Sequence, residues 1–199
     1  MAYSNFKSLK KTLKTFSLEE IDLSFFAEVP SVTPSEWLLK TLEVAKMFPL
    51  TNEKGKSERI ISPILAEVAI PYIDKITLFS GEDLTIEGEK ELSGECDFFF
   101  AKHPRKSVMQ APIITLVEAK DEDLEYGVAQ CIAQMYGAKC YNEQEGKDIP
   151  FIYGCASTGG EWKFMRLEGN SIYLDTDSYY LNDLPKIIGI FHAMIQRFL

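Results

Sequence analysis

A chain of 199 residues is long enough to bury a complete hydrophobic core in one domain, and 46% apolar with 26% charged residues is ordinary globular composition. The sequence lacks a run of about 18 apolar residues, which excludes a membrane-spanning helix, and the net charge of −9 argues against a general nucleic-acid coat protein. The N-terminal residues have no apolar segment or cleavage site typical of a signal peptide, so we expect a cytoplasmic protein.

Hydrophobic periodicity predicts helices in the first part of the chain. Residues 3–16 and 33–47 have apolar side chains at helical spacing, and the second segment begins with a threonine–proline pair that suits a helix start. Residues 57–73 are also apolar at helical spacing but contain Pro63. This predicts either a helix kinked at the proline or a new helix with Ser62 as its cap.

Strand patterns dominate the middle of the chain. Residues 75–86, 94–103 and 111–120 are three strand-like segments, close enough in sequence to pair as an antiparallel meander. A long helix is predicted over 122–140. The buried strand that follows, at 150–158, can join the sheet in parallel because a helical crossover precedes it.

The last part of the chain completes an α/β fold. A hairpin or two is predicted over 159–177, and an amphipathic helix over 181–199. The order of elements predicts a mixed β-sheet flanked by helices. We interpret residues 1–199 as a single domain with a helical N-terminal extension (1–50), a core (55–160), and hairpin strands with a closing helix (161–199).

The third strand of the predicted meander ends in two charges. Glu118 and Lys120 point to the same face of the strand, and burying such a pair costs several kcal/mol unless it is partnered or hydrated. The tripeptide Glu-x-Lys also occurs at 145–147 and 161–163, but only the first copy follows a buried apolar strand. Asp97 begins the apolar run of the preceding strand, so the two carboxylates can converge at one sheet edge.

Two carboxylates held this close repel each other unless a proton or a cation lies between them. Oxygen ligands favour Mg²⁺ or Mn²⁺. A divalent ion beside a lysine suits phosphodiester hydrolysis, in which the metal activates water and Lys120 orients or helps to deprotonate the nucleophile. The alternative is that Asp97, Glu118 and Lys120 form a surface ion cluster without a chemical role.

The pattern of Asp97, twenty residues, and then Glu118-x-Lys120, in the order helix, three strands, helix, strand, resembles the PD-(D/E)xK nuclease superfamily. The resemblance implies a restriction-endonuclease-like αβββαβ core over about half of the chain. It also implies that Asp97, Glu118 and the backbone carbonyl of Ala119 bind Mg²⁺ or Mn²⁺, and that Lys120 is the catalytic lysine. Cys96 replaces the proline of the superfamily's name, at a position that varies among its members.

Two further positions follow from this resemblance. Members commonly carry a glutamate on the first core helix, for which Glu58 and Glu67 are candidates on opposite helix faces. We favour Glu58 as the third acid and metal ligand. Gln130 resembles the glutamine of the RecB-like branch, and Gln134 shares its helix face. A polar stripe on the solvent side of the helix is the alternative interpretation.

The resemblance implies a Mg²⁺-dependent endonuclease that hydrolyses DNA, with nucleic acid as its partner and no membrane. A non-catalytic interaction or nucleic-acid-binding module that retained the fold is the alternative, and the acidic net charge favours it. Cleavage of both strands would need two sites, so a homodimer is compatible with the first function. The catalytic set under that function is Asp97, Glu118, Lys120, Glu58 and Gln130.

Positive charge in this acidic chain is concentrated in two short segments. Residues 1–15 contain four lysines and no acidic residue, and a second basic cluster lies at 102–106. Either segment can contact phosphate, and either can equally be a solvated surface. The basic residues concerned are Lys7, Lys10, Lys11, Lys14, Lys102, Arg105 and Lys106.

Overall fold

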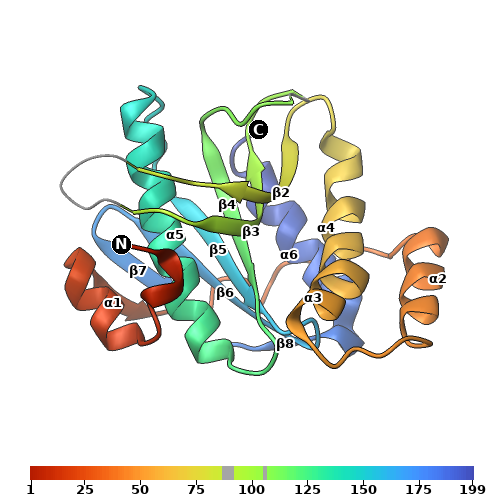
Figure 1. Cartoon of the computed structure of the whole chain (residues 1–199). Helices are drawn as coiled ribbons and strands as arrows, with labels where there is room; N and C mark the ends of the chain where they lie inside the picture. Colours follow the sequence, from red (N-terminus) through yellow and green to blue (C-terminus); the bar gives the residue numbers. More distant parts are fainter. Residues whose placement is uncertain (87–91, 105–106) are drawn as a thin grey trace.

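The computed structural model describes residues 1–86, 92–104 and 107–199. Within these residues a mixed, open β-sheet lies between two layers of helices, which confirms the predicted α/β class (Figure 1). Two of the predicted basic residues, Arg105 and Lys106, lie outside the described residues. The strands are β1 (Glu19–Asp22), β2 (Thr77–Asp83), β3 (Glu95–Ala101), β4 (Ile113–Ala119), β5 (Ile152–Ser157), β6 (Glu161–Glu168), β7 (Ser171–Leu174) and β8 (Tyr179–Tyr180).

The strand pairing follows the predicted connectivity. The sheet order is β1-β7-β6-β5-β4-β3-β2, and β8 also pairs with β6. Strands β2, β3 and β4 form the predicted antiparallel meander, and β5 joins β4 in parallel. Strands β6 and β7 form the predicted hairpin. The edge strand β1, which the sequence did not predict, pairs in parallel with β7.

The helices agree with the predicted segments except near their ends. The segment predicted as one helix over 3–16 is a short 3₁₀ turn followed by α1, and the helix predicted from 33 begins only after Ser35, whose hydroxyl accepts a hydrogen bond from the Leu38 N–H. None of the helices in the described ranges is long and apolar enough to cross a lipid bilayer. The longer helices are α1 (Leu9–Phe16), α2 (Glu36–Ala45), α4 (Ser62–Ala69), α5 (Leu124–Gln144) and α6 (Leu184–Gln196).

The chain stays helical through Pro63. Helix α3 (Glu53–Lys56) continues into a π-helical turn (Ser57–Ile61) and then into α4. Ser62 itself has helical backbone angles, so of the two alternatives for this segment, a new helix capped by Ser62 is wrong. The cap is Asn52, whose side chain accepts a hydrogen bond from the backbone of the first turn at 2.8 Å. The π turn lies immediately before Pro63, which lacks the N–H that would continue the helical hydrogen bonding.

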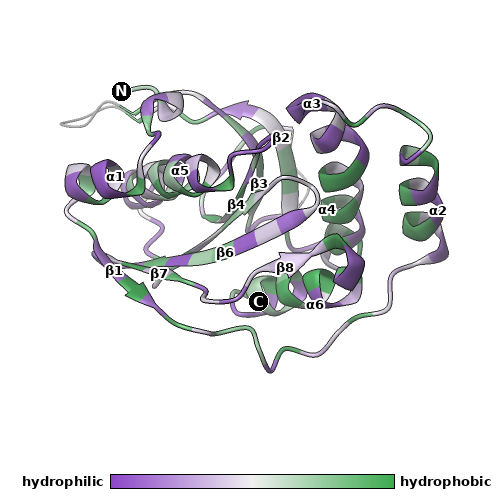
Figure 2. Cartoon of the chain, turned by 90° about the horizontal axis from the view of Figure 1, so that it is seen from below, coloured by the Kyte–Doolittle hydropathy of each residue, from purple (hydrophilic) through white to green (hydrophobic). Residues whose placement is uncertain are grey.

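Strand β4 is buried along its whole length because helices cover both faces of the sheet. Phe98, Phe100 and Val117 pack in the layer with α2, α4 and α6. Phe99 and Leu116 pack in the opposite layer with α1 and α5. Figure 2 shows the same division, with α1 and α5 on one side of the strands and α6 on the other. The charges at the end of β4 therefore lie where a nearly closed core meets the surface.

Candidate functional site

The site lies where strand β3 separates from strand β4. The last residues paired between the two strands at this end are Phe98 and Val117, which places Asp97 opposite Glu118. Beyond this point β3 continues with β2 alone, and their hairpin turns away from β4 (Figure 1). The carboxylate of Asp97 bridges the gap, because its Oδ2 accepts a hydrogen bond from the backbone N–H of Ala119 at 2.7 Å. The fork thus brings the two predicted acids close enough for Asp97 to raise the pKa of Glu118.

Glu118 and Lys120 form a buried ion pair at this fork. Glu118 Oε1 lies 2.6 Å from Lys120 Nζ, and the two residues are only 1% and 7% exposed. The same ammonium donates to the carbonyl oxygen of Ala119 at 2.8 Å. The second oxygen of Glu118 accepts a hydrogen bond from Gln134 Nε2 at 2.6 Å. The pair is therefore buried and does not lie on the surface, whereas Asp97 is partly exposed.

The electrostatics of the fork reflect an excess of acid over base. Burial, reinforced by repulsion from Asp97, raises the pKa of Glu118 to about 8, although Lys120 and Gln134 oppose the shift. Burial also raises the pKa of Asp97, against the hydrogen bond from Ala119. Burial lowers the pKa of Lys120, but attraction to Glu118 and other nearby acids outweighs it, so the net shift is upward. A further cation would stabilise the ionised form of both acids.

An open pocket of about 370 Å³ lies beside Asp97. It is bordered by the start of α3, by the π turn and by the β2–β3 hairpin. Four of its lining residues are acidic. Among the described lining residues, Lys54 alone is basic. Lys54 forms a loose, exposed pair with one of these acids, at 3.7 Å from Glu58 Oε1. The acidic lining residues are Glu53, Glu58, Glu95 and Asp97.

The structure separates the two candidate glutamates of the first core helix. Glu58, in the π turn, lines the same pocket as Asp97. Glu67 lies on α4, and its two carboxylate oxygens accept hydrogen bonds from the backbone N–H and the hydroxyl of Ser35, each at 2.7 Å. Glu67 therefore anchors the start of α2, and Glu58 is the candidate that the fold brings to the fork.

The two glutamines of α5 are both buried, so the interpretation of their stripe as the solvent side of the helix is wrong. Gln134 makes the hydrogen bond to Glu118, one turn beyond the position that the family resemblance favours. The described contacts include no bond between Gln130 and either acid of the fork. Helical periodicity places both glutamines on one face but does not say which of them reaches the end of β4.

Two neighbours of the site were not predicted from the sequence. Glu53 Oε2 lies 3.5 Å from Lys120 Nζ, so a third carboxylate contacts this lysine. Lys56 Nζ lies 2.7 Å from Asp121 Oδ1 and 2.6 Å from the Asp121 carbonyl oxygen, which attaches α3 to the loop after β4. Acidic residues are common in the first turn of a helix, so the sequence around Glu53 does not mark it as a site residue.

The donor set suits a hard divalent ion, because carboxylate and carbonyl oxygens are what Mg²⁺ and Mn²⁺ bind. In the described residues, however, no three acidic, histidine or cysteine side chains are already arranged around a metal position. Lys120 contacts both Glu118 and Glu53 and so occupies part of the space between them. Binding of an ion by Asp97, Glu118 and the Ala119 carbonyl would require the ammonium of Lys120 to move aside.

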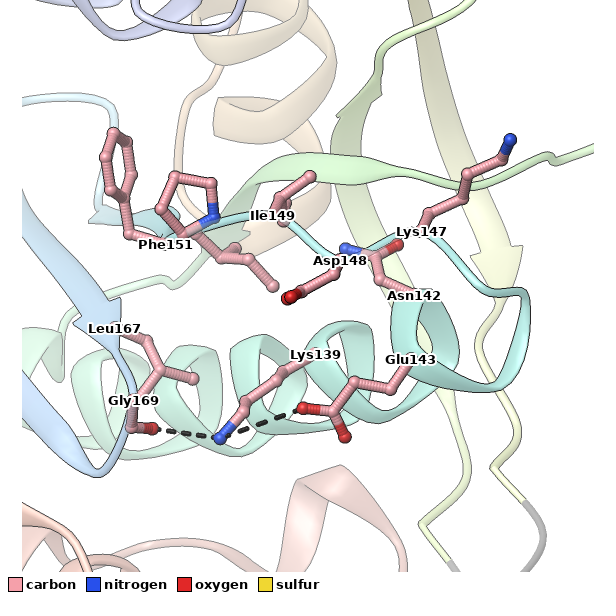
Figure 3. A pocket seen from close by; sticks show the side chains of 11 residues that line it. Lys139, Asn142, Glu143, Lys147, Asp148, Ile149, Phe151, Leu167 and Gly169 are labelled. Atoms are coloured by element: carbon pink, nitrogen blue, oxygen red, sulfur yellow. Dashed lines mark hydrogen bonds and ion pairs between the residues drawn. The ribbon is translucent and has the colours of Figure 1, made fainter.

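A second pocket, of about 150 Å³, lies near the C-terminal end of α5, away from the fork (Figure 3). Three of its polar side chains, those of Lys139, Asn142 and Glu143, have partners within the protein. Lys139 donates to the carbonyl of Gly169 at 3.0 Å and lies 3.9 Å from Glu143, and the amide of Asn142 bonds both backbone groups of Ile113 at 2.8 Å.

No protein-family model matches the sequence, and a search of curated proteins finds no match. The candidate site thus depends on the residues of the β3–β4 fork themselves.

Proposed function

We propose that the protein is a Mg²⁺- or Mn²⁺-dependent nuclease whose active site is the β3–β4 fork. The observation that carries the proposal is the buried Glu118–Lys120 pair, with the carboxylate of Asp97 bonded to the residue between them. Apolar side chains would stabilise such a position at least as well, so a buried acid–amine pair here suggests a chemical role. The order α4–β2–β3–β4–α5–β5 supports a restriction-endonuclease-like core as part of the proposal.

Each residue of the fork has a defined task in this proposal. Asp97, Glu118 and the carbonyl of Ala119 would hold the ion, with Glu58 as a further carboxylate at the pocket wall. When bound, the ion supplies stabilisation of negative charge on phosphate and lowers the pKa of water. Lys120 donates hydrogen bonds to the attacking water or to a phosphate oxygen, and Gln134 holds Glu118 in place. Hydrolysis forms a bond from the water oxygen to phosphorus and breaks the bond to the leaving oxygen.

Incubation of the purified protein with plasmid, single-stranded DNA and RNA tests this function directly. We expect cleavage of at least one of these substrates in Mg²⁺ or Mn²⁺, and none in the presence of a chelator. Hydrolysis of bis(4-nitrophenyl) phosphate tests the chemistry without a polynucleotide. Absence of metal-dependent hydrolysis of all four substrates would overturn the proposal.

A non-catalytic module that retains the fold is the second candidate function. The position of Lys120 favours it, because the ammonium is held by Glu118, Glu53 and the Ala119 carbonyl and is nearly buried. This candidate predicts metal binding without hydrolysis of any phosphodiester. The two functions are therefore separated by the same incubation.

Metal affinity should increase with pH up to about pH 8. The ion binds ionised Glu118, whose pKa is raised to about 8, so each pH unit below that value should weaken binding about tenfold.

In the metal-free protein, the free energy of unfolding should instead decrease as pH rises. Because the Glu118 carboxyl ionises near 4.5 when unfolded, the folded state binds the extra proton between the two values, and stability falls as pH rises across that range. Titration calorimetry with Mn²⁺ and thermal melts in chelator measure both trends, and pH-independent affinity would contradict the assignment of Glu118 as a ligand.

Replacing Glu58 with glutamine should weaken Mn²⁺ binding by about tenfold, because one carboxylate at the pocket wall is lost. Glu67→Gln is the matched control on the same helical segment. It should leave metal affinity unchanged and lower the free energy of unfolding by about 1 kcal/mol, because a charged partner of Ser35 at the start of α2 is removed. Equal metal affinity in the two variants would assign no ligand role to Glu58.

Gly127→Ala should slow catalysis in a protein that still folds. A Cβ at this position on α5 would lie 2.8 Å from Cγ of Lys120 and 3.3 Å from Cβ of Ala156. The buried lysine stem must shift to relieve this contact, which displaces its ammonium from the water or phosphate oxygen that it contacts in the proposal, and a misplacement of about 1 Å can cost 100-fold in rate. We expect kcat to fall by about tenfold or more, and the free energy of unfolding to fall by about 1 kcal/mol because the added Cβ crowds buried Lys120 and Ala156. An unchanged kcat would show that the position of the stem is not limiting.

A further inference from the structure

Helix α1 presents one face formed by lysines. Lys10, Lys11 and Lys14 are exposed on it, and Lys7, two residues before the first turn, is exposed as well. We call these four residues the lysine face. The described ion pairs include none of them. In a chain of net charge −9, this segment of fifteen residues without an acid stands out as a site for a polyanion.

The opposite side of α1 attaches this face rigidly to the helix that borders the candidate site. Phe16 stacks on Tyr136 of α5, with ring centroids 4.3 Å apart, and on Phe6 at 5.1 Å. The hydroxyl of Tyr126, near the start of α5, donates to the carbonyl of Ser4 at 2.8 Å. The N-terminal segment is therefore held along α5, as Figure 1 and Figure 2 both show.

Tyr126 connects the lysine face with the fork. The ammonium of Lys7 lies 5.6 Å from the centre of the Tyr126 ring, and the ammonium of Lys120 lies 5.4 Å from the same centre. The two ammonium groups are thus separated by no more than the sum of these distances. About three nucleotides cover that separation, since one nucleotide occupies about 3.4 Å of axis in a duplex strand.

We propose that the lysine face binds the phosphate backbone of a nucleic-acid strand and leads it past Tyr126 to the fork. This inference rests on the proposed function, because it assigns the approach path of that site's substrate. The acidic pocket beside Asp97 repels phosphate before a cation is bound, so attraction must come from a neighbouring surface. Lys7 places one end of the lysine face near Lys120, so this face can provide such attraction.

A nucleic acid fits this face better than an anionic membrane does. Helices that bind membranes insert their apolar side between the lipids. The apolar side of α1 is instead packed on α5, where Phe16 is buried. What remains for a partner is a row of ammonium groups on a rigid scaffold, which matches a regularly spaced series of phosphates.

The test compares two triple variants with the same change in charge. Lys10, Lys11 and Lys14 are replaced by glutamine in the first, and the exposed Lys40, Lys75 and Lys147, remote from α1, in the control. Binding of short fluorescein-labelled duplex and single-stranded oligonucleotides is measured by anisotropy over a range of salt concentrations, with Ca²⁺ present. For the duplex, the slope of log K against log salt should decrease in magnitude by about 2 to 3 in the first variant, because each lost phosphate contact contributes about 0.9. The control should keep the wild-type slope.

The outcomes distinguish this inference from the proposed function. Equal slopes in the two variants, or no binding of either oligonucleotide by the wild type, would overturn the inference. Binding of phosphatidylserine vesicles without binding of oligonucleotides would do the same and would favour a membrane. If the wild type hydrolyses bis(4-nitrophenyl) phosphate but the lysine-face variant keeps the wild-type salt slope, the nuclease proposal stands and the lysine face has no part in it. If the lysine-face variant shows the expected smaller salt slope but the wild type hydrolyses no substrate, the lysine face binds nucleic acid and the nuclease proposal is wrong.

Discussion

Replacement of Lys120 with methionine is expected to reduce metal-dependent cleavage by about 1,000-fold or more. Methionine retains much of the apolar stem but removes the ammonium that contacts Glu118 and the Ala119 carbonyl. Loss of one group that stabilises charge in a transition state typically costs about 100- to 1,000-fold, and Lys120 also sets the position of Glu118. Glu118→Gln should have an effect of the same size, because the ion loses its buried carboxylate. Cleavage rates at saturating Mg²⁺ measure both.

The repeated tripeptide provides matched controls for this prediction. Lys147→Met and Lys163→Met alter the other two Glu-x-Lys copies, which lie in an exposed loop and on β6, and both should cleave at the wild-type rate. Because Lys120→Met leaves a buried carboxyl without its partner, Glu118→Gln combined with Lys120→Met shows whether the fold survives without either charge. Cleavage that persists in this folded double variant would refute the proposed active site.

Gly189→Ala is expected to lower the free energy of unfolding by about 2 to 4 kcal/mol, the largest stability effect among these predictions. A Cβ at this buried position on α6 would overlap the carbonyl oxygen of Pro30. That segment cannot easily withdraw. Lys186 Nζ donates to the carbonyls of Ala27 and Val29 at 2.7 and 2.6 Å. The clash should outweigh the gain of about 1 kcal/mol that alanine otherwise brings to a helix.

Denaturant titration monitored by circular dichroism measures this loss, and Gly160→Ala is its control. The nearest neighbour of a Cβ at residue 160 is Thr158 Oγ1, at 3.9 Å, so this variant should differ from the wild type by less than about 0.5 kcal/mol. Equal stability of the two glycine variants would mean that the segment before α2 yields to α6 at little cost.

Short-range patterns predicted most of the fold correctly. The meander of β2 to β4, the crossover helix α5 and the parallel β5 follow from segment lengths and from apolar runs. The helical boundaries were less accurate, because a residue such as Ser62 can cap a helix or continue one, and its tertiary neighbours decide between these states. The π turn before Pro63 has no distinctive pattern in the sequence.

The sequence likewise predicted some contacts of the candidate site and missed others. Asp97, Glu118 and Lys120 could be chosen from the sequence, because a charged pair at the end of a buried strand requires an explanation and a neighbouring strand supplies the second acid. Gln134, rather than Gln130, contacts Glu118 because of how far α5 is rotated and shifted along the sheet. Periodicity shows which helix face is apolar but leaves that rotation and shift undetermined.

By itself, the sequence determined the order from β2 to β5, the apolar runs of these strands, and the charges at the end of β4, since these depend on neighbours a few residues apart. Only the tertiary structure decided that Glu53 contacts Lys120 across 67 positions, that the ammonium groups of Lys120 and Lys7 both lie near the ring of Tyr126, and that Pro30 requires glycine at 189. Such contacts depend on how whole elements pack, and packing is set by the sum of many weak side-chain interactions over both faces of the sheet.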